Sequence, residues 1–310
     1  VAAPVIPAAS LPELEAAPAK GKMLLLYGDL ARAPLSPKSW FLKDERDDRV
    51  ITLLERLEPA AVLSPPTATD YYGQLTEDWE LDLPAATIPA GTALELLREP
   101  EKPLHLCIQA QRHPATARNL VARTPGQYRK RLVLCAHFDT KINTPGASDN
   151  GGGVAALLTL AGRLKDLSLP FGLEFVAFDG EEYLPMGDDE YLRRAEGYWG
   201  DILACINFDG IGPALGATSV TCMGGPDSLA DDLRALAKNH PGVVWVEPWP
   251  ESNHSTFAMR GVPAVAFGAV GMRGLAHSAA DGLEVMSAAK LEETVQLAEG
   301  IVQWFAASIS

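Results

Sequence analysis

Residues 131–139, RLVLCAHFD, predict a buried β-strand that ends in a histidine and a carboxylate. Residues 151–167, GGGVAALLTLAGRLKDL, then predict a helix, because small residues come first and apolar residues recur at helical spacing. A strand followed by a crossover helix is the unit from which parallel sheets are built. This stretch therefore sets the expected architecture, and its polar strand end marks a candidate site.

The same alternation of strands and helices continues to the end of the chain. Further strands are expected at LHLCIQAQ (104–111), GLEFVAFDGEE (172–182), ILACINFDGIG (202–212), VVWVE (243–247) and PAVAFGAV (263–270). Helices are expected at DDEYLRRAEGYW (188–199), at DSLADDLRALAKNH (227–240) with Asp227 as its N-cap, and at 288–308. Near-continuous apolar strands of this kind favour an α/β fold, with a mainly parallel sheet covered by helices on both faces.

The N-terminal third has a different pattern. Residues 1–19 are rich in alanine and proline and predict a linker or a terminal segment. Residues 20–100 predict a small α/β module, with strand and helix patterns at MLLLYGDL (23–30), RVITLLERLEPAAVL (49–63) and ATIPAGTALELLRE (86–99). The regular alternation then assigns residues 101–310 to a second, larger α/β domain.

The overall composition restricts the classes of partner. The net charge of −14 argues against nucleic acid, since binding a phosphate backbone favours a basic face. No apolar run reaches the roughly 18 residues needed for a membrane span, and no intact signal peptide is recognisable, so a soluble protein is expected. The four cysteines form no CxxC pair, which disfavours a thiolate zinc site and leaves the compartment open.

Five side chains of metal-binding type stand at or just after the ends of apolar runs: His137, Asp149, Glu182, Asp209 and His277. Side chains at the carboxyl ends of several strands can converge, and imidazole with carboxylate is a donor set that zinc accepts. Taken singly, His137 fits a buried His–Asp pair about as well, and Asp149 fits a turn or a helix cap better. The adjacent carboxylates Asp139 and Glu181 are candidates for supporting and base roles.

Other catalytic signatures are absent from the sequence. It contains no HExxH, GxSxG or GxxxxGK[ST] motif. The remaining histidines, His105, His113, His240 and His254, are interpreted as structural or surface residues.

Over residues 101–310 the chain resembles metallopeptidase family 28, the co-catalytic dizinc aminopeptidases. The resemblance rests on HFD (137–139), PGASDNGGG (145–153), DGEE (179–182), NFDG (207–210), SNHSTFAMRGVPA (252–264) and HSAAD (277–281). It implies a mixed, mostly parallel sheet between helices, of the zinc-dependent exopeptidase type. Residues 20–100 look like a shortened protease-associated domain.

The resemblance also implies the role of each site residue. His137 and Asp209 would hold one zinc ion, Glu182 and His277 the other, and Asp149 would bridge the two. Glu181 would be the general base that activates a water between the metals, and Asp139 would orient His137. The implied activity is removal of N-terminal residues from peptides that have a free N-terminus.

The chain departs from the family pattern in three places, one of which is EEYLPMGDDEYL (181–192) in place of the usual glycine- and leucine-containing stretch after the glutamate pair. Asn253 stands where the family often has aspartate, and Ala276 where some members have a tyrosine, which leaves the oxyanion donor open. Alternative functions are a single-zinc acyltransferase resembling glutaminyl cyclases, a non-catalytic binding module, and a carboxypeptidase or dipeptidase. The last would need an arginine for the substrate carboxylate, and Arg260 and Arg273 are the candidates. Oligomeric state, native metal and preferred first residue stay open.

Overall fold

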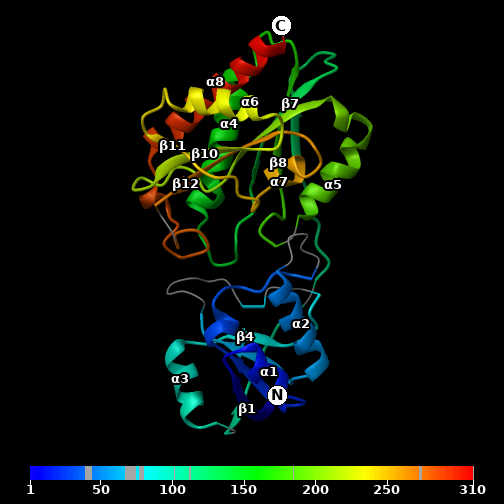
Figure 1. Ribbon diagram of the computed structural model, residues 1–310, viewed down its shortest axis with the longest axis vertical. Helices are drawn as coiled ribbons and strands as arrows, with labels where there is room; N and C mark the ends of the chain where they lie inside the picture. Colours follow the sequence, from blue (N-terminus) through cyan, green and yellow to red (C-terminus); the bar gives the residue numbers. More distant parts are fainter. Residues whose placement is uncertain are drawn as a thin grey trace. The chain divides into compact units, whose positions relative to one another are not determined.

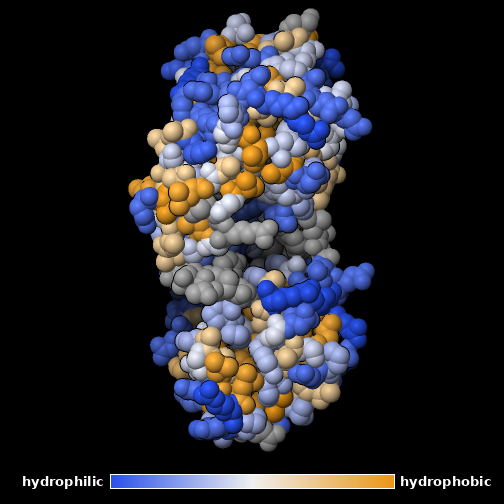
Figure 2. Space-filling view, turned by 60° about the vertical axis from the view of Figure 1, so that its left-hand side comes forward, coloured by the Kyte–Doolittle hydropathy of each residue, from blue (hydrophilic) through white to orange (hydrophobic). Residues whose placement is uncertain are grey.

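The computed structural model describes residues 1–38, 44–66, 75–76, 80–100, 102–111, 113–183, 185–271 and 274–309. The chain divides into two compact units, Val1–Pro114 (unit 1) and Ala115–Ser310 (unit 2). Figure 1 shows the elements of each unit, and Figure 2 shows that hydrophilic side chains cover much of the visible surface, with smaller hydrophobic patches between them.

Unit 2 is built on one mixed sheet. Its strands are β6 (Leu120–Arg123), β7 (Arg131–His137), β8 (Gly172–Phe178), β9 (Ile202–Phe208), β10 (Ala217–Met223), β11 (Val243–Trp245) and β12 (Ala264–Val270). Across the described residues their order is β11-β10-β12-β9-β7-β8-β6. The central strands β12, β9, β7 and β8 run parallel, while β6 and the β10–β12 pair add antiparallel neighbours. The expected mixed, mostly parallel sheet is confirmed.

Helices cover both faces of this sheet (Figure 1). They are α4 (Gly152–Leu164), α5 (Met186–Ala195), α6 (Asp227–Ala237), α7 (His254–Ala258) and α8 (Ala288–Ile309). Alternate residues of β7 enter two separate cores, as the twofold period of a strand requires. Leu132 and Leu134 pack with α4, α6 and α8 on one face. Val133 and Cys135 pack with α5 and α7 on the other.

Unit 1 holds a second, smaller sheet. Its strands are β1 (Ala2–Ala8), β2 (Met23–Leu26), β3 (Ala61–Ser64), β4 (Ala85–Thr87) and β5 (Pro103–His105). Their order among the described residues is β4-β3-β2-β1-β5, and only the β1–β5 pair is antiparallel. The helices are α1 (Leu11–Ala16), α2 (Glu45–Leu57) and α3 (Ala90–Arg98). One apolar core includes residues of α1 and α2, and the other includes Ala93 of α3.

Four local expectations from the sequence are wrong. Residues 1–19 are not a linker: they form β1, an interior strand, and α1. LHLCIQAQ forms strand only at its start, in β5, and that strand pairs with β1 of unit 1. Unit 1 accordingly runs to Pro114, beyond the expected boundary at residue 100. Pro226 occupies the N-cap position of α6, and Asp227 is its first helical residue.

The likeness of residues 20–100 to a shortened protease-associated domain remains a prediction. Arg273 lies outside the described residues. Among the residues that the structure does describe, no helix combines the length and apolar character that crossing a bilayer requires.

Candidate metal centre

The carboxyl ends of three neighbouring strands bring the candidate ligands together. In the parallel register His137 pairs with Phe178 and Cys135 with Asn207, so β7, β8 and β9 end at the same edge of the sheet. His137 is the last residue of β7, Asp209 directly follows β9, and Glu182 lies in the turn after β8. Asp149 comes from the turn Ala147–Gly151 before α4, and His277 from the loop after β12.

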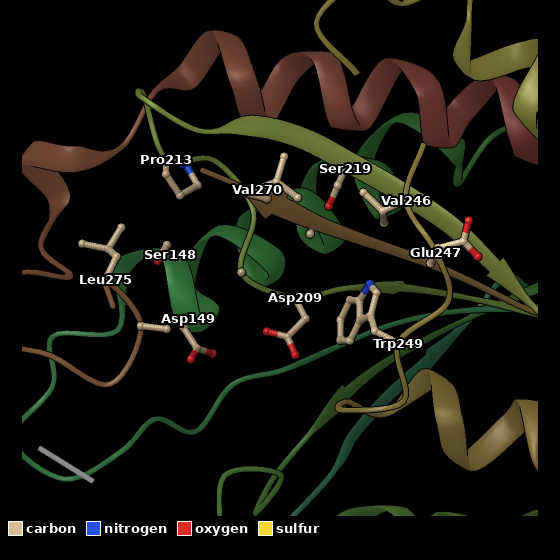
Figure 3. Close-up of a pocket in the computed structure, with 14 residues that line it drawn as sticks. Ser148, Asp149, Asp209, Pro213, Ser219, Val246, Glu247, Trp249, Val270 and Leu275 are labelled. Carbon is tan, nitrogen blue, oxygen red and sulfur yellow. The ribbon is translucent and has the colours of Figure 1, made fainter. Parts of the chain in front are cut away.

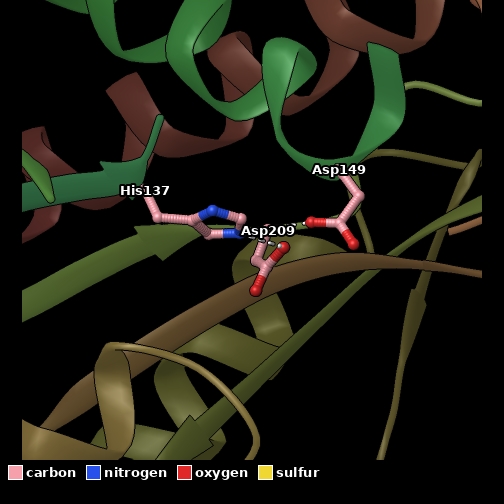
Figure 4. Close-up of side chains that lie close together, drawn as sticks. All are labelled: His137, Asp149 and Asp209. Carbon is pink, nitrogen blue, oxygen red and sulfur yellow. Dashed lines mark hydrogen bonds and ion pairs between the residues drawn. The ribbon is translucent and has the colours of Figure 1, made fainter. Parts of the chain in front are cut away.

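The first group of candidate ligands is His137, Asp149 and Asp209. The Nε2 atom of His137 lies 3.2 Å from Asp149 Oδ1 and 3.2 Å from Asp209 Oδ1. Figure 4 shows the imidazole and the two carboxylates directed at one another from β7, from the turn before α4 and from the end of β9. His137 is 1% exposed, so these contacts are shielded from bulk water.

The second group is Asp149, Glu182 and His277. His277 Nε2 lies 3.1 Å from Asp149 Oδ2 and 2.9 Å from Glu182 Oε2. Asp149 therefore belongs to both groups and offers a different oxygen to each. His277 has a φ of 60°, a left-handed conformation that costs a non-glycine residue on the order of 1 kcal/mol and tends to occur at functional sites.

The two supporting carboxylates also lie at this site. Glu181 Oε2 is 3.9 Å from His137 Nε2, so Glu181 borders the first group. The Asp139 carboxylate accepts hydrogen bonds from the backbone N–H groups of Glu181 (3.2 Å) and Glu182 (3.1 Å). His137 Nδ1 donates to the backbone carbonyl of Asp139 at 3.1 Å, and the Asp139 carboxylate lies farther away, at 3.6 Å. Asp139 thus orients the imidazole chiefly through its main chain.

The histidines are strongly basic in this environment. Burial lowers the pKa of His137, but the carboxylates of Asp209, Asp139 and Asp149 outweigh it and raise the pKa well above its usual value. For His277, burial is likewise outweighed by Asp149 and Glu182, and its pKa rises to about 11. Burial, followed by the charges of Asp209, Glu182 and Asp149, raises the pKa of Glu181 despite the opposing effect of His137. The site thus has an excess of negative charge that protons or a cation can neutralise.

One atom of the site has no partner within the described part of the chain. Glu182 Oε1 is buried and makes no hydrogen bond there. An unsatisfied buried acceptor costs roughly 1–3 kcal/mol, more if it is charged, and a bound cation would remove that cost. Two imidazoles with three carboxylates, divided into two groups that share Asp149, fit a pair of zinc ions. The residues present therefore suit the metal that the sequence suggests.

Two residues near the ligands had no role in the sequence analysis. The buried carboxylate of Asp281 accepts hydrogen bonds from the backbone N–H groups of Ser148 (2.8 Å) and Asp149 (3.1 Å). The Lys141 ammonium donates to the Glu182 carbonyl and lies 4.5 Å from the centroid of the Tyr183 ring. Asp281 belongs to the HSAAD motif (277–281), so the sequence did point to it as a residue near the site. Lys141 directly follows HFDT (137–140), and no motif indicated a role for it.

The SNH segment (252–254) contacts the end of β9, close to Asp209. Asn207 Nδ2 donates to Ser252 Oγ at 2.9 Å and lies 3.4 Å from His254 Nδ1. The fully buried His254 donates from Nε2 to the Trp249 carbonyl at 2.5 Å, which fits its expected structural role. Asn253 points elsewhere: its Nδ2 donates to the buried Asp188 carboxylate at 2.7 Å.

A cavity of about 410 Å³ opens beside the shared ligand. Asp149 and Asp209 lie along one side of it, and Ser219 and Val270 along the opposite side (Figure 3). Apolar side chains form most of the remaining wall: Pro213, Val246, Trp249, Leu275 and Ala276. Its volume falls in the usual range for small-molecule sites. The cavity can therefore hold an apolar group of a ligand whose polar end is bound at Asp149 and Asp209.

Comparisons with known proteins identify the family of the chain. The family model described as Peptidase family M28 matches residues 119–302. An aminopeptidase of Pseudomonas aeruginosa is 30% identical over 139 residues, which is 44% of this chain and 26% of that protein. The chain spans about a quarter or less of the length of such curated relatives.

Solved structures extend the likeness to the fold. BSAP, a zinc aminopeptidase from Bacillus subtilis, superposes with a TM-score of 0.76 at 20% identity, covering 97% of this chain and 74% of that one. A glutaminyl cyclase from an Acidobacteriales bacterium gives a TM-score of 0.53 at 25% identity, covering 62% of this chain and 74% of that one. The α/β fold is thus shared with both kinds of protein.

Proposed function

The chain belongs to peptidase family M28, and from that premise we propose that it is an aminopeptidase that uses two zinc ions to remove N-terminal residues from peptides. The observation that carries the proposal is the position of Asp149, whose two carboxylate oxygens face different histidines, His137 and His277. A carboxylate shared in this way is suited to bridging two cations.

Each zinc ion would have its own set of ligands. His137 and Asp209 would hold one ion, Glu182 and His277 the other, and Asp149 would bind both. Zinc bound there would act as a Lewis acid and lower the pKa of a coordinated water toward about 7. The Asp139 backbone carbonyl would fix the tautomer of His137, because it accepts a hydrogen bond from His137 Nδ1. The other ring nitrogen, Nε2, would then be available to bind the metal.

Glu181 is the proposed general base. Its carboxylate borders the first group of ligands, and its raised pKa favours holding a proton at this place. In the proposed reaction Glu181 accepts a proton from the water that attacks the peptide carbonyl carbon. It then returns this proton to the departing amine nitrogen as the C–N bond breaks.

The acidic cluster also accounts for exopeptidase action. Asp149 and Asp209 are proposed metal ligands that also line the cavity, so a free N-terminal amine can lie at the acidic cluster while the side chain of the first residue enters the cavity. A peptide with a blocked N-terminus lacks the charge that these carboxylates attract. Peptides with a free N-terminus are therefore the proposed substrates.

Hydrolysis of paired peptides tests this function. The zinc-loaded protein is incubated with a panel of peptides and with the same peptides acetylated at the N-terminus. Release of the first residue from the free peptides alone supports the proposal. Cleavage at internal bonds, or equal cleavage of the acetylated peptides, contradicts it.

A glutaminyl cyclase activity is the second candidate, because a cyclase is among the structures that share the fold at 25% identity. The presence of both ligand groups favours the two-zinc peptidase. Formation of pyroglutamate from an N-terminal Gln peptide, with no hydrolysis, would favour the cyclase. The carboxypeptidase alternative has less support: Arg260 donates to the Thr256 carbonyl within the α7 region and is not among the residues that line the cavity.

A further inference from the structure

The walls of the cavity differ in chemistry from its acidic mouth. Trp249 forms one wall next to Asp209, and it stands between Pro248 and Pro250, which limit the conformations of this loop. Its indole packs edge-on against the imidazole of His254, with 4.5 Å between ring centroids. Trp249 is therefore a fixed aromatic surface, against which a flat apolar side chain can pack.

Ser219 supplies a hydroxyl on the side of the cavity away from the carboxylates. It lies in β10, is 3% exposed, and its hydroxyl oxygen points into the cavity (Figure 3). This hydroxyl lines the cavity and is not one of the fully buried unpaired atoms of the described residues, so a group that enters the cavity can reach it. A ligand with a polar tip would provide a hydrogen-bond partner for it.

Gly268 lies directly across the sheet from Ser219. The two residues are partners in the β10–β12 ladder, and both line the cavity. A Cβ atom added at Gly268 would lie 3.3 Å from Ser219 Oγ, 3.3 Å from the backbone carbonyl oxygen of Asp209 and 3.6 Å from Trp249 Cζ2. Its φ is not in the left-handed region, so the backbone conformation does not require glycine here. The absence of a side chain at Gly268 keeps open the gap between the Ser219 hydroxyl and the Trp249 indole.

We infer that Ser219 and Gly268 determine which N-terminal residue is removed, and that the cavity selects tyrosine over phenylalanine. The inference rests on the proposed function, since it concerns the first residue of the same substrate. The ring of tyrosine would pack against Trp249 in the space that Gly268 leaves, and its phenol, which both donates and accepts, would pair with Ser219. Glu247 is exposed, and its carboxylate points away from the cavity, so no charge faces a lysine or arginine tip from that position.

The test compares kcat/KM for aminoacyl p-nitroanilides of tyrosine, phenylalanine, leucine, alanine and lysine. The wild type is expected to favour tyrosine over phenylalanine by about fivefold, the effect of one neutral hydrogen bond. Ser219→Ala should reduce that ratio to about one, because the value for tyrosine falls more than the value for phenylalanine. Gly268→Val should lower the values for both aromatic substrates more than about tenfold, and by a larger factor than the value for alanine.

Matched variants control for general effects. Ser308→Ala removes a serine hydroxyl that bonds only to the Trp304 carbonyl, and Gly162→Ala fills open space on α4. Both should leave every substrate ratio unchanged. If Gly268→Val does not fold, as judged by circular dichroism, Gly268→Ala takes its place with a smaller change in the same direction.

The outcomes separate the two proposals. A wild type that hydrolyses the panel with equal rates for tyrosine and phenylalanine, or a ratio unaffected by Ser219→Ala, overturns the inference and leaves the peptidase intact. Inactivity on every substrate instead contradicts the proposed function. Calorimetric binding of tyrosinamide and phenylalaninamide then still tests the cavity, and equal affinities overturn the inference without reference to turnover.

Discussion

The Asp281 carboxylate holds the main chain of Asp149: Asp281 Oδ2 accepts a hydrogen bond from the Asp149 N–H at 3.1 Å, across 132 residues of sequence. Its other oxygen accepts from the N–H of Ser148 at 2.8 Å. Asp281 is fully buried, so this pair of bonds fixes the turn from which the shared ligand projects. The position of Asp149 is therefore set by a residue beyond the last ligand in the chain.

Substitution Asp281→Asn should weaken zinc binding at least about tenfold, because the amide leaves only one acceptor for two backbone donors. Competition with a chromogenic chelator measures this affinity. Asp227→Asn, at an exposed position at the start of α6, is the matched control and should bind zinc like the wild type. Equal affinities for Asp281→Asn and the wild type would show that Asp281 does not position the ligand.

Glu181→Gln should retain its zinc and lose most of its activity. The amide cannot accept the proton of the attacking water, and removal of a general base lowers kcat by roughly 10²–10⁴-fold. Zinc content and kcat are measured on the same preparation, with the exposed Glu196→Gln as control. Near-wild-type turnover by Glu181→Gln would remove Glu181 from the base role.

Zinc binding should release protons. Without metal, the raised pKa values keep His137 and His277 protonated at pH 7, the latter with a pKa of about 11. A zinc ligand must be neutral imidazole, so roughly two protons leave these rings on binding, and affinity rises with pH. Calorimetric titration in two buffers of different ionisation enthalpy gives the number of protons. An observed enthalpy that is the same in both buffers would contradict the assignment of these histidines.

Asp188→Asn should stabilise the protein at alkaline pH. Burial, partly offset by hydrogen bonds from Thr256 and Asn253, raises the pKa of Asp188 from 3.8 to about 6. A carboxyl whose folded pKa is raised contributes most to stability below pH 3.8, and that contribution is lost as the pH rises through about 6. The amide also places a donor beside Asn253, whose Oδ1 is unpaired among the described residues.

The gain from Asp188→Asn should be on the order of 1–3 kcal/mol at pH 8 and smaller at pH 4. Denaturant unfolding of both proteins at the two pH values measures it, and the difference between them cancels the titration of all other groups. A difference that does not change with pH would mean that Asp188 is ionised in the same way in the folded and unfolded chain.

The sequence predicted the location of the site because of a simple geometric rule. His137, Glu182 and Asp209 each follow an apolar strand, and parallel neighbouring strands place their carboxyl ends at one edge. The imidazole–carboxylate donor set indicated zinc, and the resemblance to family 28 implied the second ion and the division of the ligands between the two. The detail that Asp139 contacts His137 through its carbonyl depends on backbone geometry, which residue spacing does not define.

The N-terminal unit was less predictable for physical reasons. Strand β1 contains Pro4 and Pro7, and proline is normally evidence against an interior strand, so residues 1–19 resembled a linker. In β10 the sequence ATSVTCM alternates weakly in hydrophobicity, although most of it is buried. The contributions of Ser219 and Gly268 depend on the pairing of β10 with β12, two strands far apart in the sequence, and neither residue alone suggests a cavity.

The most direct test of the account is the number of zinc ions per chain, measured by atomic emission on protein dialysed against metal-free buffer. The account predicts two zinc ions for the wild type, about one for His277→Ala, and a loss of both for Asp149→Ala, because Asp149 belongs to both ligand groups. One zinc ion per wild-type chain, or a full complement in Asp149→Ala, would contradict the two-metal centre.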